Sequence, residues 1–244
     1  MTYYKVLDSN GNSQHGGSFS WSLPEGSGEA AVPGEWHEVP EASMCVSGFH
    51  LTTDPTEWWK SGSRCFVAEA VDVTEETGSD KVVCRRVRLC RELSAAELAL
   101  LNIFTEGEHE VRGTVSAVAD GTASVEAYDS SSVEAFGSSS VRAYDSSSVW
   151  AYDSSSVRAY DSSSVTALGS SNVWAYGSSS VRAFGSSRVE AYNSSSVRAY
   201  DSSRVTAYDS SITIKWNPGV SVALNGQAAL VDRSSSVHTI QIGA

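Results

Sequence analysis

The sequence predicts a mainly β protein with two parts: a small α+β N-terminal domain over residues 1–108 and a β-solenoid of 8-residue repeats over residues 109–244. The first observation is a strict period, because every eighth residue from Val125 to Val205 is valine. The second is that alanine follows each valine two positions later, from Ala127 to Ala207. The third is that residues 1–108 show no such period. A fixed short period is typical of solenoids, in which each repeat stacks on its neighbours.

The N-terminal region is expected to form short strands joined by turns. Apolar residues alternate there with polar ones, as in half-buried strands, and clusters of Gly, Pro, Asn and Ser separate the runs. The expected strands are Tyr3–Leu7, Phe19–Trp21, Met44–Leu51, Cys65–Val73 and Val82–Leu89.

Two short helices are also expected in this domain. Asp54 followed by Pro55 resembles an N-cap and a first helical residue, so "DPTEWWK" predicts a short helix. Ser94 and Glu97 have the spacing of a capping box ahead of "LALLNIF". The residues expected to face a core are Leu98, Leu101 and either Leu100 or Phe104.

Composition and charge exclude several classes of protein. No window approaches 18 apolar residues, and the N-terminus lacks the basic start and apolar core of a signal peptide, so we expect a soluble protein that does not enter membranes. It would lie in the cytoplasm. Residues 1–110 carry 18 acidic and 8 basic groups, and the whole chain has a net charge of −12. Nucleic-acid binding is therefore not expected, because it needs clustered Lys and Arg.

The four cysteines are Cys45, Cys65, Cys84 and Cys90. Without a signal peptide we expect reduced, buried thiols rather than disulfides. Cys45, Cys84 and Cys90 could combine with His50 into a zinc site, but their spacings match no usual ligand pattern. We therefore predict no metal.

An even repeat preserves the alternation of side chains from one repeat to the next. The residue after each valine varies among Glu, Arg, Trp and Thr, so it is expected to face solvent. Valine, alanine and the serine two before each valine must then point inward, into a thin core. Asp, Gly or Asn, five positions along each repeat, marks the bend.

The repeat register can be extended beyond the strict valines. Continuing the count downstream divides residues 125–244 into fifteen octads, with Asn217 and Asn225 at the bend position and Trp216, Leu224 and Ile240 at the aromatic position before it. Upstream, residues 109–124 fit loosely, with Gly113 and Gly121 at bends.

Two octads per coil are favoured over three. With two, one stacked column is uniformly tyrosine, from Tyr128 to Tyr208, and the other holds every departure from tyrosine. A triangular coil of three octads would scatter those departures over more than one column. The rings are expected to point outward or to lie at the corner before the bend.

The aromatic residues of the solenoid are its candidate binding residues. A stripe of tyrosines on a surface marks an interaction face or else a set of rings that only stack on one another. Trp150 and Trp174 are the sharper indication, because exposed Trp often anchors a protein, a glycan or another copy. The candidate residues are Tyr128, Tyr144, Trp150, Tyr152, Tyr160, Trp174, Tyr176 and Tyr192. The repeats contain no catalytic constellation, because their uniform serines lack placed bases.

Two resemblances follow from particular motifs. "YYKVLDSNG", "CVSGFHLTTDPTEWW" and "KVVCRRVRLCREL", followed by octads of the "VRAYGSS" type, resemble uncharacterised proteins of actinobacterial phages and prophages. That resemblance implies a small N-terminal domain followed by a repeat tail, and a location in the cytoplasm of the producing host or in a virion. It implies no site residues.

"GFHLTTDPTEWW…CFVAEA" is also similar, over this short stretch alone, to diphtheria-toxin-like ADP-ribosyltransferases. This resemblance implies an NAD-binding site near His50, Thr52, Trp58 and Glu69, with Glu69 in the place of the catalytic acid. His50 stands where that family has tyrosine, and the residues alone also allow a buried, structural histidine there.

The sequence thus supports a non-enzymatic structural or interaction protein of phage origin that needs no cofactor. Its solenoid faces are expected to bind a protein, a glycan or another copy of the chain, and the last of these would give a homo-oligomer. The alternative is an ADP-ribosyltransferase-like, NAD-binding head domain carried on a solenoid. Ice binding is a third hypothesis. It needs a flat, regular face, and the Arg, Glu and Trp residues that follow the repeat valines make the face irregular.

Overall fold

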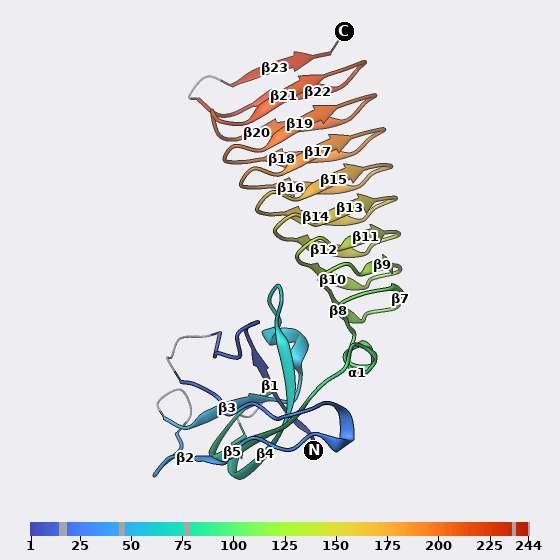
Figure 1. Ribbon diagram of the computed structural model, residues 1–244. Helices are drawn as coiled ribbons and strands as arrows, with labels where there is room; N and C mark the ends of the chain where they lie inside the picture. The colour runs from blue at the N-terminus through green and yellow to red at the C-terminus, as the bar shows by residue number, and fades with distance from the viewer. Residues whose placement is uncertain (15–18, 44–46, 76–78, 236–237, 244) are drawn as a thin grey trace. The chain divides into compact units, whose positions relative to one another are not determined.

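The protein folds into two compact units, which we call the head (Met1–Ile103) and the solenoid (Phe104–Ala244). Figure 1 shows a computed structural model of residues 1–244, and its described residues are 1–14, 19–43, 47–75, 79–235 and 238–243. Strands hold 48% of the residues and helices 6%, which confirms a mainly β fold. The units divide after Ile103, slightly before the expected boundary at residue 108, and each is described separately below.

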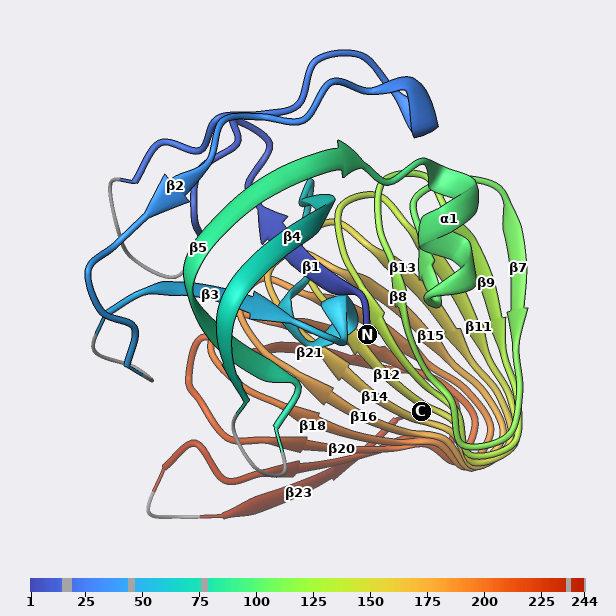
Figure 2. The ribbon, with the colours of Figure 1, turned by 90° about the horizontal axis from the view of Figure 1, so that it is seen from below.

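The head is a small β structure. In the described part of the chain its strands are β1 (Tyr3–Leu7), β2 (His37–Glu38), β3 (Phe49–Thr52), β4 (Arg64–Glu75) and β5 (Lys81–Glu92). They form one antiparallel sheet in the order β2-β5-β3-β1-β4, and β5 also pairs with β4. Strands β5, β3, β1 and β4 therefore close into a ring, around which the long β4 and β5 curve (Figure 2).

The helices of the head begin where the capping signals predict. A 3₁₀ helix, η2 (Pro55–Trp58), follows Asp54, whose side chain accepts a hydrogen bond from the backbone N–H of Thr56. Helix α1 (Ala95–Leu100) follows the capping box of Ser94 and Glu97, and both of its reciprocal hydrogen bonds form. A further 3₁₀ helix, η1 (Gly28–Ala30), was not expected. Of the residues predicted to face a core, Leu98 and Phe104 are buried, Leu101 is half-buried and Leu100 is exposed.

Most of the expected head strands are confirmed, and one is wrong. Phe19–Trp21 is not a strand: only Ser20 makes an isolated bridge, while the rings of Phe19 and Trp21 pack edge to face at 5.2 Å. Aromatic packing rather than sheet pairing explains that apolar run. Residues 44–46 of the expected strand Met44–Leu51 lie outside the described residues, and β3 begins at Phe49.

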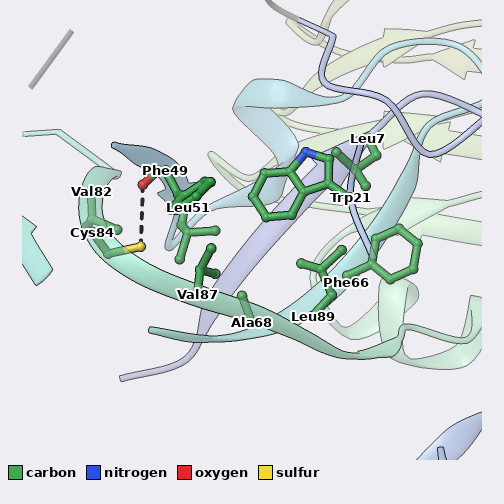
Figure 3. Close-up of a cluster of buried hydrophobic side chains, with 10 residues drawn as sticks. All are labelled: Leu7, Trp21, Phe49, Leu51, Phe66, Ala68, Val82, Cys84, Val87 and Leu89. Carbon is green, nitrogen blue, oxygen red and sulfur yellow. Dashed lines mark hydrogen bonds between the residues drawn. The ribbon is translucent and has the colours of Figure 1, made fainter. Parts of the chain in front are cut away.

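The core of the head lies between the paired strands. Trp21 lies among Leu7 and Phe66 on one side and Phe49 and Leu51 on the other, as Figure 3 shows. Residues of β5 complete this cluster, including Val87 and Leu89. The inward residues come from strands that are far apart in sequence, so the core depends on long-range pairing.

The solenoid consists of two sheets whose strands are parallel up to β22 and alternate along the chain, so that successive strands of one sheet lie about two octads apart. In the described residues these are the ten-stranded sheet, β23-β22-β20-β18-β16-β14-β12-β10-β8-β6, and the eight-stranded sheet, β21-β19-β17-β15-β13-β11-β9-β7. Val133 pairs with Val149 and Val141 with Val157, which confirms two octads per coil. Figure 2 shows the two sheets as two layers of the coil.

Apart from the two-residue β6, which begins at the last residue of the head, each solenoid strand spans half of an octad. The strands are β6 (Ile103–Phe104), β7 (Glu108–Val111), β8 (Ser116–Ala119), β9 (Ser124–Ala127), β10 (Ser132–Ala135), β11 (Ser140–Ala143), β12 (Ser148–Ala151), β13 (Ser156–Ala159), β14 (Ser164–Ala167), β15 (Asn172–Ala175), β16 (Ser180–Ala183), β17 (Arg188–Ala191), β18 (Ser196–Ala199), β19 (Arg204–Ala207), β20 (Ile212–Lys215), β21 (Ser221–Leu224), β22 (Ala229–Asp232) and β23 (Thr239–Ile242).

The inward residues are those that the alternation predicts. From Val125 to Val205 the repeat valines are at most 2% exposed, and the repeat alanines are fully buried. The serine two before each valine is fully buried as well, from Ser131 to Ser203. The residue after each valine is half-buried or exposed, so the prediction that it faces outward is confirmed.

The upstream extension of the repeat is confirmed, whereas the downstream one is confirmed as far as Asn217 and wrong beyond it. His109 pairs with Val125 and Ala117 with Val133, which keeps the spacing of two octads. At the other end, a spacing of two octads would pair Val205 with Ser221. Val205 instead pairs with Val222, one position further along the chain.

The extra residue lies in the turn that contains Asn217, Pro218 and Gly219. Asn217 and Trp216 keep their expected positions, since Asn217 Oδ1 accepts a hydrogen bond from the N–H of Asp201 and the Trp216 ring stacks on Tyr200. Beyond them the count shifts by one: Leu224 pairs with Ala207, so it occupies an alanine position and not the aromatic one. Asn225 moves likewise into the aromatic position, since its N–H donates to the carbonyl of Ala207.

The last octad does not continue the coil. Strand β23 pairs antiparallel with β22, with Val231 opposite Ile240 and Leu230 opposite Gln241. Ile240 is 74% exposed on this strand and not part of an aromatic column. β23 is therefore a cap on the ten-stranded sheet, as the ends of solenoids require.

Candidate functional site

The head contains a cavity of about 540 Å³. Strands β1 and β3, helix η2 and the loop residues around Trp21 contribute side chains to it. This volume lies in the range of small-molecule sites. The lining residues that matter most below are Lys5, Trp21, His50, Thr52, Trp58 and Lys81.

Three of the four predicted head residues line this cavity, and the fourth does not. His50 and Thr52 lie on β3, and Trp58 ends η2. Glu69 lies on β4, is exposed, and accepts a hydrogen bond at 2.7 Å from Nε of Arg88 on the adjacent strand β5. The residue chosen as the catalytic acid of a transferase is thus held in a surface ion pair and does not line the cavity.

Thr52 and Trp58 both donate hydrogen bonds to the carboxylate of Asp80. The indole N–H of Trp58 donates to Oδ2 of Asp80 at 2.6 Å, and the Thr52 hydroxyl donates to the same oxygen. The backbone N–H of Thr53 donates to the carbonyl of Asp80 at 2.9 Å. These contacts tie β3 and η2 to the segment that enters β5, which is a structural role.

The surroundings of His50 favour its uncharged form. Burial lowers the pKa of its imidazole, and the nearby ammonium groups of Lys81 and Lys5 lower it further. This direction agrees with the interpretation of His50 as a structural histidine, which the residues alone allowed.

Lys5 is the residue that sequence reasoning missed. Tyr3, Lys5 and Leu7 alternate along β1, so Lys5 points to the same side as the core residue Leu7. Its Nζ donates to the carbonyl of His50 at 2.9 Å and lies 4.8 Å from the centre of the Trp21 ring. Burial lowers the pKa of its ammonium group to about 8. A charged residue on the apolar side of a predicted strand was the available signal.

Of the three described cysteines, two are buried as expected and one is not. Cys65 and Cys84 are buried, and burial raises the pKa of each to about 12. The Cys84 thiol donates to the carbonyl of Phe49 at 3.5 Å (Figure 3). Cys90 is half-buried, and Cys45 lies outside the described residues. Among the residues that the structure describes, no cluster of His, Cys, Asp or Glu could hold a metal.

In the solenoid, the uniform tyrosine column forms as predicted. Its neighbouring rings stack face to face, with centroids 4.7 to 5.2 Å apart and planes within 11° of parallel. Ring faces inside the column are therefore covered by other rings. We call this set the tyrosine column: Tyr128, Tyr144, Tyr160, Tyr176, Tyr192 and Tyr208.

The tyrosine column runs beside outward residues of the eight-stranded sheet that pair with one another. Tyr128 donates to Glu126 at 2.7 Å, a hydrogen bond that raises the pKa of Tyr128 to about 12. Arg142 forms an ion pair with the same Glu126 at 3.1 Å, and Arg158 lies over the ring of Trp174 at 5.2 Å. We call the outward residues of this sheet the eight-strand face: Glu126, Arg142, Arg158, Trp174, Glu190 and Thr206.

The predicted aromatic residues do not form one site. Trp150 lies on β12 of the ten-stranded sheet and Trp174 on β15 of the eight-stranded sheet. Tyr152 follows β12 and is likewise separated from the tyrosine column. The two tryptophans are three octads apart, and an odd number of octads places residues on different sheets.

The ten-stranded sheet presents a different outer surface. The residues that follow the repeat valines form an outward column on this sheet, and Trp150 in that column is 39% exposed. The column lies beside the second aromatic column, which contains Tyr152, Leu168, Phe184 and Tyr200. Arg182 and Arg198 are exposed and lie directly opposite each other on β16 and β18. We call this column the ten-strand face: Glu134, Trp150, Thr166, Arg182 and Arg198.

Comparisons with protein-family models, with curated proteins and with solved structures find no match to this chain. The resemblances to phage proteins and to ADP-ribosyltransferases therefore stay predictions. Within the described residues, no helix has the length and apolar character needed to cross a bilayer.

Proposed function

We propose that this is a non-enzymatic interaction protein, of phage origin, in which the rigid solenoid binds an acidic protein partner through the ten-strand face. The unpaired arginines of that face are the observation that carries the proposal. Arg182 and Arg198 lie on adjacent strands, and among the described residues neither forms an ion pair. Like charges directly opposite in a sheet repel each other, so carboxylates of a partner would relieve an unfavourable pair.

Trp150 supplies the apolar part of this surface. It is 39% exposed and is followed along the same column by Thr166 and then by Arg182. Trp and Arg are, with Tyr, the residue types enriched among those that dominate binding energy in protein interfaces. On the eight-strand face, by contrast, Glu126, Arg142 and Trp174 already contact other residues of the same face.

The ADP-ribosyltransferase alternative is not favoured by any observation. Glu69 does not line the cavity that contains His50, and Thr52 and Trp58 are engaged with Asp80. Titration with NAD remains the direct test of that hypothesis.

A pair of threonines at matched positions allows a test of the proposal. Thr166 lies at the variable position of the ten-strand face, and Thr206 lies at the same position of the eight-strand face. Each is replaced in turn by the photo-crosslinking residue p-benzoylphenylalanine in the full chain, which is irradiated in cells of the producing host. We expect a discrete protein adduct from position 166 and none from position 206.

The adduct must also depend on the proposed side chains. R182A/R198A and W150A should each reduce its yield by about tenfold, the size expected for losing one interface anchor. Trp174→Ala, the matched change on the other face, should leave it unchanged. An adduct that forms equally from both positions, or one that survives R182A/R198A, would contradict the proposal.

A further inference from the structure

We propose that the cavity of the head binds a small aromatic anion, a planar ring system that carries one carboxylate or phosphate group. This inference concerns the head alone and does not rest on the partner proposed for the solenoid. Two independent features of the cavity lead to it: its charge and the nature of its walls.

The cavity is positive in an acidic protein. Lys5 and Lys81 line it, and its described lining includes no Asp or Glu. The Asp80 carboxylate lies behind the lining, where it accepts hydrogen bonds from Thr52 and Trp58. The chain as a whole has a net charge of −12. A lining that holds ammonium groups but no carboxylate, in a protein with an excess of carboxylates, indicates that the cavity accepts a negative charge.

Lys5 is half-buried and has no anionic partner among the described residues. Within the described residues its Nζ contacts the His50 carbonyl and the Trp21 ring, and it forms no ion pair. Both contacts are weaker than pairing with a full negative charge, and a buried charge is costly unless it is paired. The lowered pKa of its ammonium group reports the same cost, because burial is the leading cause. An anion beside Nζ would offset it.

The walls select a flat, apolar body. Phe19, Trp21 and Phe49 pack edge to face, with ring centres 5.2 to 5.7 Å apart, and all three line the cavity. Trp58 adds another ring, 5.9 Å from Nζ of Lys81. Aromatic walls bind planar rings by stacked or edge-to-face contact. A volume of about 540 Å³ accommodates one or two fused rings with an anionic group.

Isothermal titration of the full-length chain with paired probes tests the charge requirement. Indole-3-acetate is compared with indole-3-acetamide, which has the same shape without the charge, and phenyl phosphate is compared with inorganic phosphate. We expect at least one aromatic anion to bind with one-to-one stoichiometry and a Kd below about 1 mM, and its partner probe to bind at least about tenfold more weakly. The two pairs show whether a carboxylate or a phosphate is preferred.

Variants locate the binding. Lys5→Met, which keeps the length of the side chain, should weaken binding of the aromatic anion by about tenfold and remove its advantage over the neutral probe. Lys60→Met, at an exposed lysine that does not line the cavity, should bind like the unmodified chain. Unchanged affinity in Lys5→Met, or equal binding of charged and neutral probes, would overturn the proposal.

A measurement on the unmodified chain makes the conclusion independent of how the variant folds. The bound anion should slow acetylation of the Lys5 amine, followed by peptide mass spectrometry, while acetylation of Lys60 keeps its rate. No binding of either aromatic anion at about 1 mM, or no protection of Lys5, would overturn the assignment.

Discussion

At the scale of single residues, the bend position of the repeat has two roles, of which the sequence indicates one. Asp, Asn or Gly is required because the residue adopts a left-handed conformation, with φ of 55° at Asp201. The structure adds a hydrogen bond between coils: Oδ2 of Asp201 accepts from the backbone N–H of Gly185, one coil earlier, at 3.0 Å. Asp129, Asp153, Asn193 and Asp209 make the same contact. The bend residue therefore ties each turn to the turn before it.

Substitutions at Asp201 separate these two roles. Asp201→Asn keeps both and should leave the free energy of unfolding nearly unchanged. Asp201→Gly keeps the left-handed backbone but loses the acceptor, which costs about 1 kcal/mol. Asp201→Ala also suffers the left-handed penalty, which costs about 1 kcal/mol more. Urea denaturation followed by circular dichroism measures the series, and equal stability of the Gly and Ala variants would contradict it.

At the scale of elements, the ends of the solenoid need residues that the repeat does not contain. The turn with Pro218 and Gly219 adds one residue, and the chain then ends with the antiparallel strand β23 instead of another parallel one. β23 covers the edge of β22, where Leu230 is only 6% exposed. An uncovered edge of β22 would be a site for unwanted pairing with other chains, so we expect the cap to stabilise the solenoid and to limit association.

Truncation after Ser235 removes this cap. We expect the free energy of unfolding to fall by about 2 kcal/mol, the order for uncovering one or two apolar side chains, and association of the chains to increase. Urea denaturation and analytical ultracentrifugation measure the two effects. Ile240→Ser is the control, because Ile240 is 74% exposed and its substitution leaves the backbone pairing intact. A truncated chain as stable as the full chain would show that β23 contributes nothing.

At the scale of the whole molecule, the two units depend on different kinds of information. The solenoid is one-dimensional: each coil contacts its neighbours through columns of like residues, such as Val141 on Val157 and Tyr144 on Tyr160. The head instead closes a ring of strands, in which β1 pairs with both β3 and β4. Its core and its cavity exist only when these distant segments meet.

Deletions within the solenoid test the column rule. Removing residues 157–172 takes out one whole coil and joins Ser156 to Val173 in register, so the columns stay continuous. Removing residues 157–164 takes out one octad and places Leu168 next to Tyr144 in the tyrosine column. We expect the free energy of unfolding of the chain with this smaller deletion to be lower by about 1 kcal/mol, because one aromatic stack is lost. Equal free energies of unfolding in urea would show that the identity of the columns does not matter.

The sequence by itself determined the period of the solenoid, the inward valines, alanines and serines, the bend residues and the two octads per coil. These follow from local rules, because alternation along a strand and a repeated register carry from one coil to the next. Once the coil was set at two octads, the odd spacing of Trp150 and Trp174 also implied different faces.

Only the tertiary structure decided the cap, the cavity and the position of Lys5. The antiparallel pairing of β23 and the closure of the head depend on contacts between segments with no shared pattern. Lys5 lies among the rings of Trp21 and its neighbours because β1 is held between β3 and β4. The pairing of distant, non-repeating strands has no periodic signal in the chain, and that is the physical reason why this site had to be seen in three dimensions.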